Sequence, residues 1–187
     1  KYSNHKMRLK HGMIISSLSW LWACIICGLV MYFVTDINII DGMFESMSAL
    51  TGSGITIYSD VEVLPQSILF FRAIQQWVGG LGVVVMIIAI LTKPGTSSAK
   101  LYQSEAREDR IKPSTKATLI QTIKIYLIYT AAGIILYLLA GMPVFDSICN
   151  TFSIISTGGM GIKNANIGFY NNEIIYYGEI FRLWLFV

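Results

Sequence analysis

The chain alternates long apolar runs with shorter polar connections. Residues 12–34 contain no charged side chain, residues 68–91 are interrupted only by Arg72, and residues 118–140 are interrupted only by Lys124. An α-helix rises about 1.5 Å per residue, so each run gives roughly 34 to 36 Å of helix. A hydrocarbon core is about 30 Å thick. We therefore predict three membrane-spanning helices.

Two shorter apolar stretches, residues 37–50 and 144–155, follow the first and third runs. They have a helical pattern, but they are too short to cross a bilayer and too apolar to lie in water. Each leads into a Gly-rich stretch, Thr51-Gly52-Ser53-Gly54-Ile55-Thr56 or Ser156-Thr157-Gly158-Gly159-Met160-Gly161. Non-helical backbone at membrane depth is tolerated only inside protein or along a water-filled cavity. The pattern predicts two re-entrant segments and favours a pore.

The two halves of the chain carry the same order of features. A shift of 105 residues pairs Gly28 with Gly133, Asp41 with Asp146, Ser48 with Ser153 and Gly54 with Gly159. Identity this low proves little between apolar segments, but the order of span, acidic turn, short helix, Gly-rich stretch and second span also recurs. Phe181-Arg182 repeats Phe71-Arg72 after a five-residue insertion.

The expected organisation is therefore a cytoplasmic segment (1–11), a first span–pore helix–span repeat (12–91), a cytoplasmic linker (92–117) and a second repeat (118–187). The last helix of the second repeat begins near Ile180 and is cut short at Val187. Since the chain also starts at Lys1 without a methionine, we expect it to be a fragment of a longer protein.

Composition agrees with a membrane protein. Hydrophobic residues make up 54% of the chain and charged residues 13%, and the mean hydropathy is +0.59. A soluble domain carries about a quarter charged residues, so the composition disfavours a soluble enzyme or a nucleic-acid-binding protein. Three cysteines cannot form a disulfide scaffold.

The charges are sorted along the chain. Most of the 14 basic residues lie in residues 1–10 and 92–117, whereas residues 35–67 contain no Lys or Arg and carry five acidic residues. Cytoplasmic loops are enriched in Lys and Arg, so we expect the N-terminus and the linker in the cytoplasm and the Gly-rich stretches on the outer side. The net charge of +3 is then the sum of a basic inside and an acidic outside, and it indicates no acidic partner.

This arrangement suits a cation better than an anion. Asp41 and Asp146 stand where N-caps of the short helices are expected. The negative end of each helix dipole would then point to its Gly-rich stretch. Rings of backbone carbonyls can replace the water shell of a cation, and Thr and Ser hydroxyls can add ligands. An anion pathway would need basic side chains at this depth.

Several of these motifs together resemble the Trk/Ktr/HKT potassium transporters. The first half of the resemblance is carried by Ala49-Leu50-Thr51-Gly52-Ser53-Gly54-Ile55-Thr56, Leu64-Pro65, Phe70-Phe71-Arg72 and Gln76-Trp77-Val78-Gly79-Gly80-Leu81-Gly82. The second half is carried by Phe145-Asp146-Ser147 and Phe152-Ser153-Ile154-Ile155-Ser156-Thr157-Gly158-Gly159. Together these motifs cover most of the chain.

The resemblance implies an all-α integral membrane subunit with four unequal repeats around one pore. The implied filter positions are Thr51, Gly52, Ser53, Gly54, Ser156, Thr157, Gly158 and Gly159. Potassium would be the transported ion, no cofactor is implied, and transport would be passive or ion-coupled. The first stretch has Thr-Gly-Ser-Gly where bacterial members usually have Thr-Thr-Thr-Gly, so sodium or mixed transport stays open. The family also implies the plasma (inner) membrane, a homodimer and a cytoplasmic nucleotide-binding regulatory subunit that docks near residues 100–112.

Other interpretations of single features are weaker. Ser53 could be a nucleophile, but no histidine lies in any span to serve as its base, so an intramembrane enzyme is disfavoured. A non-conducting membrane scaffold remains an alternative. Gly79, Gly80 and Gly82 indicate close helix packing. Arg72 and Arg182 occupy matching places near the outer ends of their spans; we favour a structural role for both over direct contact with ions.

Overall fold

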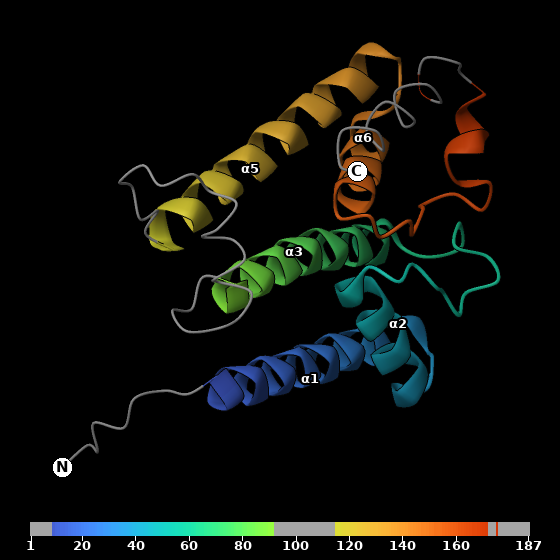
Figure 1. Cartoon of the computed structure of the whole chain (residues 1–187). Helices are drawn as coiled ribbons and strands as arrows, with labels where there is room; N and C mark the ends of the chain where they lie inside the picture. The colour runs from blue at the N-terminus through green and yellow to red at the C-terminus, as the bar shows by residue number, and fades with distance from the viewer. Residues whose placement is uncertain (1–8, 92–114, 172–174, 176–187) are drawn as a thin grey trace.

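The computed structural model describes residues 9–91, 115–171 and 175, and this part of the chain is helical without any strand. The long helices are α1 (Leu9–Thr35), α3 (Gln66–Leu91) and α5 (Thr115–Leu139). The short ones are α2 (Ile39–Thr51), α6 (Val144–Ile155) and the 3-10 helix η1 (Asn166–Tyr170). The predicted all-α architecture is confirmed (Figure 1).

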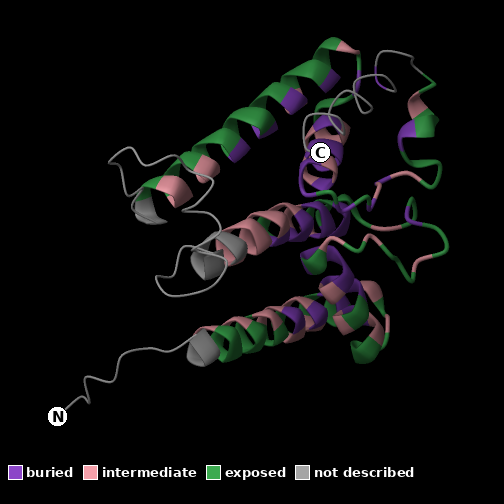
Figure 2. Cartoon of the chain, in the orientation of Figure 1, coloured by how far each residue is buried: buried purple, intermediate pink, exposed green. Residues whose placement is uncertain are grey.

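The three long helices provide the predicted spans. The stretches Gly12–Thr35, Gln66–Met86 and Ala117–Leu139 are long and apolar enough to cross a membrane. α3 is the most buried of the three, while much of α1 and α5 is exposed (Figure 2). The exposed residues of α1 and α5 include many large apolar ones. The predicted helix that begins near Ile180 lies outside the described residues, as do residues 92–114 of the predicted linker.

The long helices lie side by side, and α3 runs opposite to α1 and α5 (Figure 1). Both short helices lie at the same end of this array, and both pack against α3. Glycines permit the closest of these contacts. A Cβ on Gly79 would overlap the carbonyl oxygen of Leu50 in α2, and one on Gly80 would lie 2.8 Å from the Ser156 Cβ that follows α6. The packing role predicted for these glycines agrees with the structure.

The turns that join α1 to α2 and α5 to α6 have the same backbone conformation. α1 is followed by Asp36 with φ 50°, and α5 is followed by Gly141 with φ 86°. These two residues are 105 positions apart, as are the extended residues Asn38 and Pro143 that precede the short helices. An aspartate adopts this left-handed conformation more readily than most side chains.

The predicted N-caps are wrong. Asn38 and Pro143 occupy the N-cap positions, and neither makes a side-chain capping hydrogen bond. Asp41 and Asp146 lie inside the first turn of their helices, where a carboxylate still interacts favourably with the positive end of the helix dipole. The acidic residues therefore lie at the expected ends of the short helices, but three residues after the N-cap positions.

The two halves share a core. Leu69 and Ala73 of α3 cluster with Cys149 of α6 and with Val61 and Ile162 from the loops. Further along α3, the Trp77 ring stacks on Phe152 of α6 with ring centroids 5.1 Å apart. The same indole donates to the Thr130 hydroxyl of α5 at 3.1 Å. α3 therefore joins the first half of the chain to the second.

Candidate functional site

The two Gly-rich stretches leave their short helices through the same pattern of backbone hydrogen bonds. Ser53 N donates to Ser48 O at 3.1 Å, and Gly158 N donates to Ser153 O at 2.9 Å. Gly52 N and Thr157 N likewise donate to the carbonyls of Ala49 and Ile154, at 3.2 and 2.9 Å. Each residue is 105 positions from its counterpart. The register proposed from weak sequence identity is therefore reproduced by the backbone.

Left-handed residues also recur in this register. Gly52 and Thr157 have φ values of 72° and 58°, and Gly54 and Gly159 have φ values of 72° and 76°. A glycine takes this conformation freely, but a β-branched residue such as Thr157 is an outlier there. The Thr157 hydroxyl donates to the Ser156 carbonyl at 2.7 Å. Strained residues that the surrounding structure holds in place are typical of binding sites.

The two stretches, far apart in the sequence, meet in space. A Cβ on Gly54 would overlap the carbonyl oxygen of Gly158, and one on Gly52 would lie 3.4 Å from the carbonyl oxygen of Ser156. The structure thus places Gly52 and Gly54 of the first stretch directly against Ser156, Gly158 and Gly159 of the second. The negative, C-terminal ends of α2 and α6 both point at this meeting place, where they favour a cation.

Hydroxyl groups at the start of each stretch turn back to their own helices. Thr51 is the last residue of α2, and its hydroxyl donates to Met47 O at 2.8 Å. Ser156 donates to Phe152 O at 2.9 Å, again 105 positions on. The lone pairs of these two hydroxyl oxygens remain available to bind a cation. The Ser53 hydroxyl lies 2.9 Å from that of Ser48, which also donates to Ile55 O at 2.5 Å.

A buried ion pair holds the chain that leaves the first stretch. Arg72 Nε lies 2.8 Å from Glu45 Oε1, and the side chains are 2% and 0% exposed. The carboxylate also accepts from the Thr56 hydroxyl at 2.9 Å and from Ile57 N at 3.0 Å. Arg72 Nη2 donates to the Thr56 hydroxyl at 3.0 Å. The network ties α2, α3 and residues 56–57 together, and within the described part of the chain these hydrogen bonds end on residues 45, 56, 57 and 72.

Glu45 is a supporting residue that sequence reasoning missed, since it was counted only among the acidic residues of positions 35–67. A signal was available: a lone carboxylate inside an apolar helix at membrane depth needs a basic partner. Arg72 was the basic residue with no assigned partner. Arg182, its counterpart in the second half, lies outside the described residues.

Different groups surround the second stretch and the helix α6 that precedes it. Asn150 stands where Glu45 does in the first half, and its Nδ2 donates to the Tyr170 hydroxyl oxygen at 3.4 Å. The Tyr170 hydroxyl in turn donates to Asp146 at 2.6 Å. Burial, together with this carboxylate, raises the pKa of Tyr170, which therefore stays a neutral donor. Asn166 Nδ2 donates to the Gly159 carbonyl at 3.3 Å.

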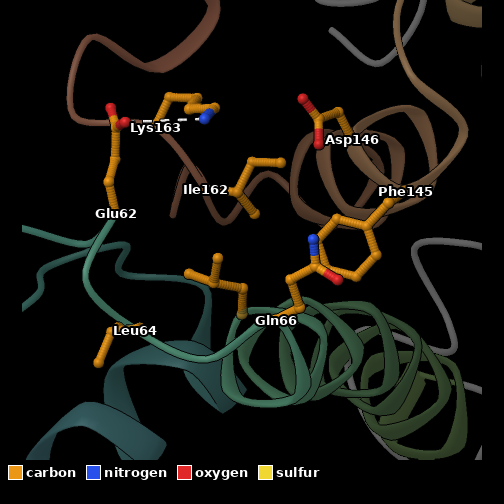
Figure 3. Close-up of a pocket in the computed structure, with 8 residues that line it drawn as sticks. Glu62, Leu64, Gln66, Phe145, Asp146, Ile162 and Lys163 are labelled. Carbon is orange, nitrogen blue, oxygen red and sulfur yellow. Dashed lines mark ion pairs between the residues drawn. The ribbon is translucent and has the colours of Figure 1, made fainter.

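The loops that follow the two stretches are clamped to each other. Asn164 donates to Asp60 Oδ1 at 2.8 Å and accepts from Val61 N at 2.9 Å. Lys163 and Glu62 form an ion pair at 3.6 Å beside a small pocket, whose far side is formed by Phe145 and Asp146 (Figure 3). The bonds from Asn164 and from the Glu62 amide lower the pKa of Asp60.

Comparison with known proteins decides the family. The sequence profile of the TrkH family, described as cation transport protein, matches residues 1–186. The chain belongs to the TrkH family. Members of this family are transporters and not enzymes. The family and the three long apolar helices together make the chain a multi-pass membrane protein.

Similar proteins include an uncharacterised cation transporter of Methanocaldococcus jannaschii, 44% identical over 159 residues, covering 84% of this chain and 34% of that protein. The Trk system potassium uptake protein TrkG of Escherichia coli is 35% identical over 181 residues, covering 94% of this chain and 37% of that protein. The crystal structure of the potassium transporter TrkH from Vibrio parahaemolyticus matches with a TM-score of 0.83 at 30% identity, covering 99% of this chain and 37% of that chain. The chain thus spans little more than a third of the length of these TrkH-family relatives.

Proposed function

We propose that this chain contributes to potassium uptake across a cell membrane, and that residues 51–54 and 156–159 are two segments of its selectivity filter. One observation carries the proposal: two Gly-rich stretches with matching left-handed residues contact each other at the C-terminal ends of two short helices. Carbonyls presented by such a backbone are the ligands that replace the hydration shell of a cation.

The domain organisation and orientation are part of the proposal. We assign residues 12–91 and 118–187 to two span–pore helix–span repeats with re-entrant filter loops. The N-terminus and residues 92–117 lie in the cytoplasm, the filter segments face outward, and the host membrane is the plasma membrane. The sorting of basic and acidic residues supports this orientation.

Potassium is the favoured ion because both stretches have a glycine at the matching left-handed position, Gly54 and Gly159. Relatives named as potassium uptake proteins or as a potassium transporter support the same choice. Sodium or mixed transport by the same fold is the second candidate, since Gly52 and Ser53 depart from the usual Thr-Thr of bacterial members. A homodimer and a cytoplasmic nucleotide-binding subunit are the partners that we propose by analogy with the family.

Complementation tests the proposed function. The complete gene is expressed in a host that lacks its own potassium uptake, and growth is followed at low external potassium. We expect the wild type to restore growth and Gly54→Ser and Gly159→Ser to abolish it at equal membrane levels. If both variants support growth as well as the wild type does, the filter assignment fails and a scaffold role is favoured.

A further inference from the structure

Gln76 is an unusual side chain in the core of the described structure. It lies on α3 with 0% exposure, and neither its amide nitrogen nor its amide oxygen has a hydrogen-bond partner among the described residues. A buried amide without a partner carries a desolvation penalty, so a helix selected for stability alone would place an apolar residue here. Such exceptions call for an explanation in function.

The amide of Gln76 lies directly against the second Gly-rich stretch. A Cβ built on Gly158 would lie 2.6 Å from Gln76 Cδ and 2.9 Å from both Nε2 and Oε1, and these three are its nearest neighbours. One turn further along α3, Gly80 approaches Ser156 at the start of the same stretch. The face of α3 that carries Gln76 and Gly80 therefore contacts both ends of the turn over residues 156–158.

The contact explains why residue 158 is a glycine. Gly159 has a left-handed φ of 76°, whereas Gly158 has no left-handed φ, so its backbone does not demand glycine. The demand comes from Gln76, which fills the space that a side chain at 158 would need. Because Gln76 is completely enclosed, its amide has no solvent-filled space into which it can move aside.

We propose that Gln76 is a positioning residue that holds the backbone of residues 156–159, so that α3 of the first half sets the geometry of the filter segment of the second half. The proposal rests on the function proposed above, because it concerns how well that segment binds the transported ion. It predicts that a change at Gln76 alters apparent ion affinity and ion preference while the protein still folds.

A double-mutant cycle on the full-length transporter tests this inference. Potassium uptake is measured for the wild type, Gln76→Ala, Gly158→Ala and the double variant, at matched amounts of folded protein. We expect Gly158→Ala to lower uptake at least about tenfold and the double variant to recover to the level of Gln76→Ala alone, since residues in contact couple this strongly. Gln76→Ala itself should raise the apparent KM for potassium and lower the preference for potassium over sodium.

Two matched controls make the rescue specific. Gly54→Ala combines a left-handed φ with overlap against the Gly158 carbonyl, so Gln76→Ala should not rescue it. Gln75→Ala removes a second buried amide without a described partner, and it should not rescue Gly158→Ala. Independent, multiplicative losses in the cycle, or wild-type uptake by Gly158→Ala, would overturn the assignment.

The outcome for Gln76 can be separated from the outcome for the proposed function. Absence of potassium uptake by the wild type would count against the function alone. In that case the same four proteins are purified and their thermal unfolding is compared. A Tm loss in Gly158→Ala that Gln76→Ala relieves would support the contact as a positioning device, and equal losses with and without Gln76 would reject it.

Discussion

The glycines of the two Gly-rich stretches are required for different physical reasons. Gly54 has a left-handed φ, and a Cβ there would also overlap the Gly158 carbonyl. Gly159 has a left-handed φ of 76°, but a Cβ there would meet nothing within 4 Å among the described residues. Gly158 has no left-handed φ, but a Cβ there would lie 2.6 Å from Gln76 Cδ. The three glycines can therefore be ranked by how much an alanine substitution at each should destabilise the fold.

This ranking gives a prediction for two alanine variants. Gly159→Ala should destabilise the purified protein by about 1–2 kcal/mol, the cost of a left-handed conformation for an L-residue. Gly54→Ala should destabilise it by clearly more, because the overlap with a backbone oxygen adds to that cost. Thermal unfolding in detergent measures both. A larger loss for Gly159→Ala than for Gly54→Ala would contradict this assignment of strain.

Breaking the buried ion pair of Arg72 and Glu45 should impair folding. Removing one member leaves the other charged and buried, which typically costs about 3–5 kcal/mol. Arg72→Gln should therefore lower the amount of folded protein and its Tm much more than it changes ion preference. Replacing both members by apolar residues, as in Arg72→Met with Glu45→Leu, should recover much of the loss. Normal folding with altered ion preference in Arg72→Gln would refute the structural role.

The sequence pattern located the two Gly-rich stretches but did not identify the side chains that hold them in place. The stretches carry a local signal, since glycines follow a short apolar helix. The pairing of Glu45 with Arg72 joins positions 27 residues apart, and the contact of Gln76 with Gly158 joins positions still further apart. No local periodicity encodes such contacts. They depend on how α3 is placed between α2 and α6.

At the scale of the elements, the apolar runs predicted the helices closely. Residues 144–155 form α6 at the predicted limits, and α2 begins two residues later than predicted. The error lay in the caps, where Asp41 and Asp146 were expected to cap the short helices. An acidic residue is favourable both at the N-cap and within the first turn, so composition alone does not separate the two positions.

The clamp between the two outer loops gives a prediction about pH. The pKa of Asp60 is lowered from its ordinary value of 3.8 because its carboxylate accepts from Asn164 and from the Glu62 amide. Its charged form therefore stabilises the folded state above pH 3.8, and this contribution is lost as the pH falls through the lowered pKa. Wild-type protein should exceed Asp60→Asn in Tm near neutral pH, and the difference should shrink below pH 3.8. A difference that grows on acidification would contradict the clamp.

At the scale of the whole molecule, the two halves share a backbone but differ in their supports. The left-handed residues and the hydrogen bonds that close the short helices recur at a separation of 105 residues. Yet the Glu45–Arg72 pair bonds residues 56 and 57, just after the first stretch, whereas Asn166 donates to Gly159 within the second stretch. Sequence identity between the two halves was too low to establish the repeat, because their backbones match while most of their side chains differ.

Residues 51–54 and 156–159 are the segments that we propose to select potassium over sodium. The most direct measurement is ion flux into vesicles that contain the purified full-length transporter, with potassium or sodium as the only cation. We predict rapid potassium flux, little sodium flux, and loss of this preference in Gly54→Ser and Gly159→Ser at equal reconstituted amounts. Equal potassium and sodium flux in the wild type, unchanged by either substitution, would contradict the account.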